Sequence, residues 1–453
     1  MTPTARPVGG PIVGQGAPGT RPADRFIIEG GTPLHGTVQV GGAKNAALPI
    51  MAACLLTRER CIVHNVPDIE DIKCMARVLE SIGARVDFLG GGSVAIEAAE
   101  LTSCAPPTDM MRRMRASFLV MGPLLTRMGE ARAPHPGGCA IGVRPVNVDI
   151  RGFGAMGARI SQVDGNYVAQ AGEGGLRGSS IYLDYPSHTG TENLLMAAVL
   201  ARGKTVIKHA SVEPEVVDLA NFLVGMGARI SGIGSTRLEI EGVDELHGAS
   251  HSVIPDRLAA GTFAIAAAIS GGEVRVERVV CEHMDPVTYK LLEAGAEVEE
   301  GDDWLRVAGR RPLFAVEIQA IHYPGFPTDL QAAFGALLTQ AQGTSLIHER
   351  VFENRLLYAA ELQKMEAAID VSGQTARITG PTRLKGASVK ALDIRSGAAV
   401  ILAALAAEGT TIVEDVHHVD RGYPDLVGTL SGLGASIRRE SATDSNLPLH
   451  PVI

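Results

Sequence analysis

Apolar residues along this chain follow two spacings, and the two alternate. A run of small apolar residues with helical spacing is followed by a glycine or polar stop and then by a short strand of alternating β-branched residues. This pattern predicts helix–strand pairs in the segments 47–66, 191–210, 259–279, 330–350 and 396–416. Because the predicted helices are rich in alanine on all sides, they are expected to be buried all round.

A second pattern, an apolar helix end followed by Gly-Ala and a strand, recurs at intervals of roughly 70 residues. A glycine in the left-handed conformation is the usual end of such a helix. It is expected at Gly83, Gly157, Gly227, Gly295 and Gly434. The last interval is about two periods long, and Glu366 occupies the glycine position near its middle. The chain therefore contains six copies of one unit, one of them degenerate.

Six copies of a strand–helix–strand–helix–strand unit this long fit two pseudo-threefold domains better than one open array. The predicted fold class is α/β, with two domains that each contain three copies of a βαβαβ-type unit. Three repeats lie between Gly41–Lys44 and Val253–Asp256, so the chain is expected to cross between domains there. The predicted parts are a disordered lead-in at 1–24, one domain of 25–43 plus 254–453, and a second domain of 44–253.

Composition narrows the class of protein. The 453 residues include 41 basic and 50 acidic side chains, a net charge of −9 that argues against a general nucleic-acid-binding protein. The longest apolar runs, 259–269 and 398–407, are too short for a membrane helix, which needs about 20 residues. The Gly/Pro-rich N-terminus has no apolar core of a secretory signal. The six cysteines have no paired spacing, which favours free thiols in the cytoplasm.

Cys139 lies in the segment PHPGGCAIGVRP, residues 134–145, and is a candidate reactive thiol. A cysteine among proline and glycine residues is expected in an exposed loop rather than in a core helix. The nearest charged residue in sequence, Arg144, would favour the thiolate. An incidental surface thiol is the alternative. The other five cysteines lie in apolar or ordinary contexts and are expected to be structural.

Two further segments place polar residues at the start of a predicted helix. Lys44 and Asn45 follow two glycines, so free backbone N–H groups and the lysine charge could bind an anion; a solvated lysine is the alternative. Asp329 follows the turn YPGFPT and could be a general base on a stiff loop, or a plain N-cap.

Arginines at predicted helix starts and turns complete the candidate set. They are Arg115, Arg144, Arg355, Arg395 and Arg421. A guanidinium binds carboxylate or phosphate through two parallel hydrogen bonds, although each of these could also be a surface ion pair. Convergence on one anion requires a site between the domains, because two of the five lie in the N-terminal half of the chain. The 13 histidines are dispersed, and the sequence predicts no metal or cofactor site.

Six segments, VGGAKNAALP, MRAS, PGGCAIGVRP, YPGFPTD, FENR and DRGY, resemble the enolpyruvyl transferase family in order and spacing. The resemblance covers about residues 26 to 437 and implies two inside-out α/β barrel domains joined by a double crossing. It also implies a reaction, the transfer of the enolpyruvyl group of phosphoenolpyruvate to the 3′-hydroxyl of UDP-N-acetylglucosamine with release of phosphate. That reaction is the first committed step of peptidoglycan synthesis and occurs in the cytoplasm. The resemblance implies no cofactor, metal, nucleic acid or membrane partner.

The resemblance further implies roles for individual residues. Cys139 matches a general acid that can attach to phosphoenolpyruvate and that epoxides of the fosfomycin type alkylate, and Asp329 matches the proposed base. The implied contacts of phosphoenolpyruvate are Lys44, Asn45, Arg144, Arg355, Arg395 and Arg421. The implied contacts of the UDP-sugar are Asn45, Arg115, Arg144, Pro145, Val146, Asn147, Val148, Ser187, His188, Thr189, Gly190, Asp329 and Val351.

The chain departs from the family pattern at two places. Asn147-Val148-Asp149 stands where the family often has Asp-Leu-His, and residues 187–191 read Ser-His-Thr-Gly-Thr where Ser-Val-Gly-Ala-Thr is typical. Both segments match the part of the site that would hold uridine and diphosphate, and an amide in place of a carboxylate changes which uracil edge can be recognised. Two alternatives therefore stay open: an enolpyruvyl transferase with another uridine nucleotide acceptor, and a catalytically silent paralogue that binds a nucleotide-sugar.

Overall fold

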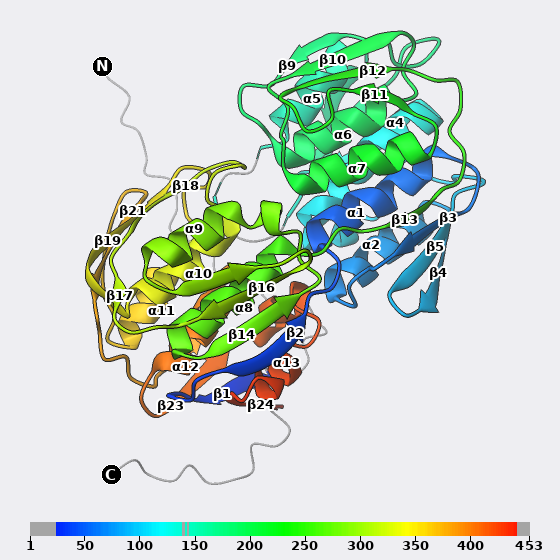
Figure 1. Cartoon of the computed structure of the whole chain (residues 1–453). Helices are drawn as coiled ribbons and strands as arrows, with labels where there is room; N and C mark the ends of the chain where they lie inside the picture. Colours follow the sequence, from blue (N-terminus) through cyan, green and yellow to red (C-terminus); the bar gives the residue numbers. More distant parts are fainter. Residues whose placement is uncertain (1–23, 138–140, 143–144, 442–453) are drawn as a thin grey trace, which may run out of the picture.

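The chain folds around two separate hydrophobic cores. The computed structural model describes residues 24–137, 141–142 and 145–441, and Figure 1 shows them as two lobes. One core draws on residues 43–253, and the other on 26–40 together with 258–437. The chain passes between the lobes twice, and the two passages are hydrogen-bonded: Ala43 donates its N–H to the Ile254 carbonyl at 2.8 Å. We propose the domain boundaries at these two passages.

The described residues of the first domain form three sheets. Their strands in spatial order are β13 (Ser250–Ser252), β3 (Cys61–His64), β5 (Ser93–Glu97) and β4 (Arg85–Gly90); β6 (Glu130–Pro134), β8 (Asn166–Gln170) and β7 (Arg159–Val163); and β11 (Arg229–Ser231), β12 (Arg237–Glu241), β10 (Lys204–Lys208) and β9 (Ser180–Tyr182). Its helices are α1 (Lys44–Ala53), η1 (Cys54–Leu56), α2 (Glu70–Ser81), α3 (Thr108–Arg113), η2 (Arg115–Val120), α4 (Met121–Met128), α5 (Asn147–Ala155), α6 (His188–Ala198) and α7 (Pro214–Gly225).

In the part of the second domain that the structure describes there are also three sheets, and two of them contain one of the first two strands along the chain. Their strands are β22 (Ser388–Lys390), β23 (Thr410–Glu414), β1 (Arg25–Glu29) and β24 (Ser436–Glu440); β15 (Glu297–Glu300), β16 (Trp304–Ala308), β14 (Glu273–Glu277) and β2 (His35–Gln39); and β17 (Leu313–Phe314), β19 (Ala341–Glu349), β21 (Thr375–Gly380) and β20 (Ala368–Ser372), with β18 (Glu317–Ala320) beside β19. The helices are α8 (Arg257–Ser270), η3 (Cys281–His283), α9 (Asp285–Glu293), α10 (Thr328–Leu338), α11 (Tyr358–Lys364), α12 (Ile394–Ala406), η4 (Val416–Arg421) and α13 (Leu426–Gly432).

The sheets show the predicted repetition. Five of the six sheets in the described residues share one arrangement. A central strand has a parallel neighbour on one side, and on its other side two further strands follow, each antiparallel to the one before it. The sheet β6-β8-β7 has only the antiparallel part. The alanine-rich helices α8, α10 and α12 pack against one another and are buried on nearly all sides, as their composition predicts. Figure 1 shows the sheets outside these helices.

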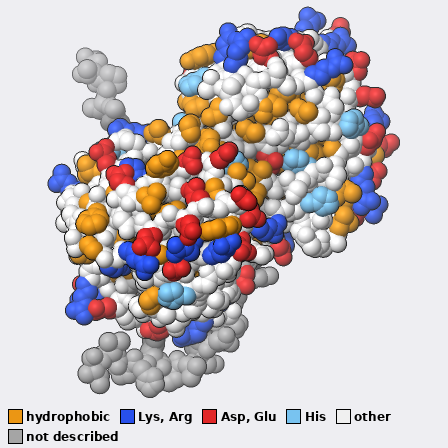
Figure 2. Space-filling model, viewed as in Figure 1, with side chains coloured by type: hydrophobic (Ala, Val, Ile, Leu, Met, Phe, Trp, Pro, Cys, Tyr) orange, Lys and Arg blue, Asp and Glu red, His pale blue; other side chains and the backbone are white. Residues whose placement is uncertain are grey.

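Charged side chains on the visible face of the molecule do not segregate by sign (Figure 2). On the face shown in Figure 2, acidic and basic side chains are interspersed over both lobes. Within the described parts of the chain, no helix has the length and hydropathy that a bilayer crossing requires.

The helix-ending glycines have the predicted backbone conformation. Their φ angles are +106° at Gly83, +92° at Gly157, +99° at Gly227, +90° at Gly295 and +100° at Gly434. The degenerate copy keeps the same geometry without the glycine, because Glu366 has φ +68°. The backbone of the unit is therefore preserved even where its usual residue is not.

We expect Glu366→Gly to stabilise the protein. A residue with a side chain is strained in the left-handed conformation, and glycine removes that strain. Because glycine also loses more backbone entropy on folding, the net increase in the free energy of unfolding is about 0.5–1 kcal/mol. The ion pair of Glu366 with Lys385, at 2.9 Å, joins two largely exposed side chains and contributes little. The matched control is Gly157→Ala, where an added Cβ meets no atom within 4 Å and only the backbone strain changes. Thermal unfolding should show a higher Tm for the first variant and a lower Tm for the second; a lower Tm for both would contradict the strain at Glu366.

Candidate active site

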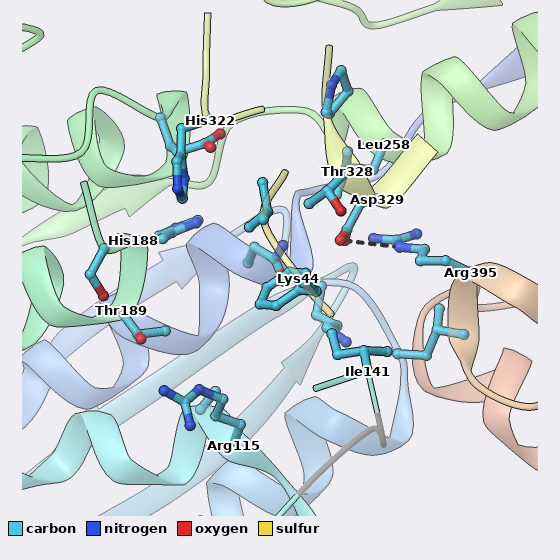
Figure 3. A pocket seen from close by; sticks show the side chains of 18 of the residues that line it. Lys44, Arg115, Ile141, His188, Thr189, Leu258, His322, Thr328, Asp329 and Arg395 are labelled. Atoms are coloured by element: carbon cyan, nitrogen blue, oxygen red, sulfur yellow. Dashed lines mark hydrogen bonds and ion pairs between the residues drawn. The ribbon is translucent and has the colours of Figure 1, made fainter. Parts of the chain in front are cut away.

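A pocket of about 470 Å³ lies between the two domains and is lined by residues of both. Figure 3 shows Asp329 and Arg395 on one side of it, His188, His322 and Thr189 on the other, and Lys44 between them. We call these two sides the Asp329 side and the His188 side. The sequence segments that were singled out for chemistry, which are far apart along the chain, thus converge on one cavity.

On the Asp329 side, one carboxylate holds two arginines. Arg355 donates from Nη2 to Asp329 Oδ1 at 2.8 Å, and Arg395 donates from Nε to Oδ2 at 3.0 Å. Burial raises the pKa of Asp329, but the two guanidinium charges outweigh burial and hold this pKa well below its usual range. Both arginines are themselves buried. A second anion that entered here would find two preorganised guanidinium groups.

The structure excludes the plain N-cap interpretation of Asp329. The cap position of α10 is Pro327, which makes no side-chain cap, and the Asp329 carboxylate bonds to arginines of other elements. Asp329 lies in the first turn of α10 and lines the pocket, and the turn that precedes the helix leads directly into it. Asp329 is therefore held at the start of a helix rather than on the expected loop, and its role as a general base stays a prediction.

A second carboxylate, Asp71, holds two cations from opposite domains. Lys44 Nζ lies 2.9 Å from Asp71 Oδ2, and Arg421 donates from Nε to Oδ1 at 2.9 Å. Burial raises the pKa of Asp71, and the charges of Lys44 and Arg421 lower it further than burial raises it, so the carboxylate is ionised. Lys44 is thus not a solvated lysine. The sequence analysis missed Asp71, which reads as an ordinary acidic residue in the first turn of α2.

On the His188 side, the candidate residues come mainly from the first domain. Arg115 starts η2 and donates to the Pro145 carbonyl at 3.1 Å. Ser187 caps α6 by accepting from the Gly190 N–H at 3.1 Å, so that His188 and Thr189 open the helix beside the pocket. The predicted UDP-sugar contacts that line the pocket are Asn45, Arg115, Pro145, Ser187, His188, Thr189, Asp329 and Val351.

Some predicted residues lie elsewhere. Val146 and Val148 are buried in the core of the first domain, and a Cβ added at Gly190 would come within 2.5 Å of Val148 Cγ1. These three and Asn147 are not among the residues that line the pocket. Cys139 and Arg144 lie outside the described residues. Ile141, two residues after Cys139, does line the pocket, and its carbonyl accepts from the Asn354 N–H at 3.0 Å.

The remaining polar groups of the pocket indicate acid–base and anion-binding chemistry. Within residues 24–137, 141–142 and 145–441, no group of three or more His, Cys, Asp or Glu side chains is placed to hold a metal ion. What the pocket does offer is four cationic side chains in two pairs, each pair centred on one buried or half-buried carboxylate. Such a site can bind a substrate with two anionic groups and place a carboxylate next to it.

Comparison with known proteins identifies the family. The family model of EPSP synthase (3-phosphoshikimate 1-carboxyvinyltransferase) matches residues 28–430, and the chain belongs to this family of enolpyruvyl transferases. Two of its relatives carry a more particular name. UDP-N-acetylglucosamine 1-carboxyvinyltransferase of Finegoldia magna is 48% identical over 413 residues, which cover 91% of this chain and 97% of the relative. UDP-N-acetylglucosamine 1-carboxyvinyltransferase 2 of Carboxydothermus hydrogenoformans is 49% identical over 420 residues, covering 92% and 100%.

Solved structures agree on the fold. The enolpyruvyl transferase NikO from Streptomyces tendae superposes with a TM-score of 0.84 at 26% identity, over 93% of this chain and 100% of that one. EPSP synthase from Acinetobacter baumannii superposes with a TM-score of 0.73 at 18% identity, over 92% and 100%, and shows the fold alone. The predicted class, two inside-out α/β domains of repeated units, is confirmed.

Proposed function

We propose that this protein transfers the enolpyruvyl group of phosphoenolpyruvate to the 3′-hydroxyl of UDP-N-acetylglucosamine and releases phosphate. The observation that carries the proposal is that four of the cationic side chains lining the pocket form two pairs, Lys44 with Arg421 and Arg355 with Arg395, each pair on one carboxylate. Phosphoenolpyruvate has two anionic groups, a phosphate and a carboxylate, and needs two such subsites. The names of relatives that are nearly half identical support the same reaction.

In this proposal the Asp329 side binds phosphoenolpyruvate. Lys44 and Arg421, with Asn45 and Arg144, contact the phosphate, and Arg355 and Arg395 contact the carboxylate. When phosphoenolpyruvate binds, its carboxylate accepts hydrogen bonds from Arg355 and Arg395 in place of Asp329, which accepts them in this structure. Because those charges depress the pKa of Asp329, their transfer to substrate makes Asp329 a stronger base.

The proposed chemistry is an addition followed by an elimination. The 3′-oxygen of the sugar bonds to C2 of phosphoenolpyruvate, its proton passes to Asp329, and the Cys139 thiol gives a proton to C3. The product of this step is a tetrahedral ketal. The bond between C2 and the phosphate oxygen then breaks, with its electron pair on the phosphate, which takes the proton held by Asp329. C3 returns a proton to the Cys139 thiolate, and the double bond of the enolpyruvyl group forms again. The four cations stabilise the negative charge of the departing phosphate and of the carboxylate.

The His188 side binds the nucleotide-sugar in this proposal. Its proposed contacts are the pocket residues Arg115, Pro145, Ser187, His188, Thr189, Val351, Asn45 and Asp329. Arg144 stays a proposed contact on the resemblance alone, whereas Val146, Asn147, Val148 and Gly190 do not line the pocket and are not retained as contacts. The pathway is peptidoglycan synthesis and the compartment is the cytoplasm. The free thiols of Cys54, Cys61, Cys74, Cys104 and Cys281 agree with a reducing compartment.

Phosphate release tests the proposal. The purified protein is mixed with phosphoenolpyruvate and UDP-N-acetylglucosamine, and inorganic phosphate is followed over time. We expect phosphate to appear only when both substrates are present. Release with UMP or another uridine nucleotide, but not with UDP-N-acetylglucosamine, would assign that nucleotide as the acceptor. This alternative is tested because the chain departs from the family pattern at Asn147 and His188. No release with any acceptor would favour the silent paralogue.

A further inference from the structure

Glu192 is a carboxylate that the proposed chemistry does not use, and it is buried in the wall of the pocket. Only 1% of its side chain is exposed. Its hydrogen-bond partner is the imidazole of His188, one helical turn earlier, with Nε2 donating to Oε1 at 3.1 Å. Among the described residues no other side chain pairs with Glu192, and an isolated buried carboxylate is strongly unfavourable. The pair therefore fixes the ring of His188 in one orientation.

The proton of this pair is held on the imidazole. Burial lowers the pKa of His188, but Glu192, Glu213 and Glu215 raise it by more, to about 10. Burial also raises the pKa of Glu192. Because the pKa of both groups is raised, the pair keeps its proton above neutral pH. The proton stays on the imidazole, which is the more basic of the two groups. His188 is therefore a cation across the physiological range.

Charged and titratable groups from other elements lie near the pair. Glu213 and Glu215, at the start of α7, are both bound by Arg257 of α8, which lies 3.0 Å from Glu215. From the second domain, His322 faces the same side of the pocket (Figure 3), and burial lowers its pKa, so that it is neutral. Arg257 and His188 together offset two of the three carboxylates. Loss of the His188 charge would leave Glu192, Glu213 and Glu215 with the one cation Arg257, and therefore with two uncompensated negative charges.

We propose that His188 determines the acceptor specificity of the pocket, because its positively charged imidazole donates a hydrogen bond to a phosphate of the nucleotide diphosphate. In this proposal Glu192 is the positioning residue, which holds the imidazole in its orientation and in its charged form. The Nε2 atom is committed to Glu192, and Nδ1 has no hydrogen-bond partner in the described part of the chain. His188 lines the pocket, and 27% of its side chain is exposed. This inference rests on the proposed function, because it takes the acceptor to be a nucleotide diphosphate.

The first test is His188→Gln, whose amide can still donate to Glu192 but carries no charge. We expect the KM for UDP-N-acetylglucosamine to rise about tenfold or more, as for loss of one charge-assisted hydrogen bond. The KM for phosphoenolpyruvate and the kcat at saturating acceptor should stay within about twofold of the wild-type values, since those depend on the Asp329 side. The matched control is His35→Gln, an exposed histidine at the start of β2. An unchanged acceptor KM in His188→Gln would overturn the proposal.

The second test is the pH dependence of Glu192→Gln. Without this carboxylate the pKa of His188 falls toward its ordinary value of about 6.5. The imidazole is then charged at pH 6 and largely neutral at pH 9. We expect the acceptor KM of the variant to match or fall below the wild-type value at pH 6, because a negative charge has been removed, and to exceed it at pH 9. A purely structural role of Glu192 would weaken binding equally at both values, and that result would contradict the proposal.

Calorimetric titration with UDP separates failure of this proposal from failure of the proposed function. If wild-type protein releases no phosphate with UDP-N-acetylglucosamine, the proposed function fails. If UDP then binds wild-type and His188→Gln protein equally, the role of His188 fails as well. Weaker UDP binding by His188→Gln would support that role in a protein that binds nucleotides without turning them over. Thermal unfolding of both variants checks that they are folded, and His188→Gln provides the test if Glu192→Gln is not.

Discussion

Asp329→Asn is expected to lower kcat by about 10²–10⁴-fold, the usual contribution of a positioned general base. The variant keeps the shape of the side chain but cannot accept the proton of the sugar hydroxyl. It also releases Arg355 and Arg395 from a competing carboxylate. The KM for phosphoenolpyruvate should therefore stay the same or fall while kcat collapses. A steady-state titration of both substrates measures the two effects separately.

Asp71→Asn is the matched control, because it also removes one carboxylate that lies between two pocket cations. Asp71 holds Lys44 and Arg421 in place across the domain interface, and the proposed chemistry gives it no part in proton transfer. Its replacement should change the KM for phosphoenolpyruvate more than kcat. If Asp71→Asn and Asp329→Asn lower kcat to the same extent, loss of pocket charge explains both, and the assignment of Asp329 as the base is wrong.

The architecture could be predicted because short sequence patterns that determine local structure recur along the chain. A left-handed residue after a helix is a property of a few neighbouring positions, and glycine marks it in five copies of the unit. Even the exception, Glu366, adopts the same backbone. The burial of helices α8, α10 and α12 could likewise be predicted from their own alanine-rich composition. Regularity along the chain was therefore enough to predict two domains of three units.

The arrangement within the pocket could not be predicted in the same way, because its decisive pairs join distant segments. Asp71 and Arg421 are 350 positions apart and belong to different domains. Nothing near Asp71 distinguishes it from an acid that stabilises a helix start. Glu192 sits one turn from His188, yet the sequence alone does not show that its carboxylate is buried. The motif segments supplied candidate residues, of which Lys44, Asp329 and Arg395 line the pocket, and only the structure showed which carboxylate each cation faces.

Reactivity toward an epoxide of the fosfomycin type should be confined to Cys139, although the chain has six cysteines. Burial raises the pKa of Cys54, Cys74, Cys104 and Cys281, which leaves these thiols protonated at neutral pH. A hydrogen bond from Cys54 lowers the pKa of Cys61, but Cys61 is fully buried. Mass spectrometry of the digested protein after treatment should find the added mass on the Cys139 peptide, with Cys104→Ala as a control that changes nothing.

Cys139→Ala is expected to lower turnover by about 10²–10⁴-fold, because the proton donor to C3 is lost. Binding of the nucleotide-sugar should survive, since the His188 side is untouched, and calorimetry measures it independently of turnover. Cys139→Asp restores a group that can give a proton but has no thiol, so it should remain active and resist the epoxide. These two variants separate acid catalysis from covalent attachment: activity in Cys139→Asp shows that a proton at this position suffices. Retained turnover in Cys139→Ala, or an active Cys139→Asp enzyme that the epoxide still inactivates, would refute the role of this thiol.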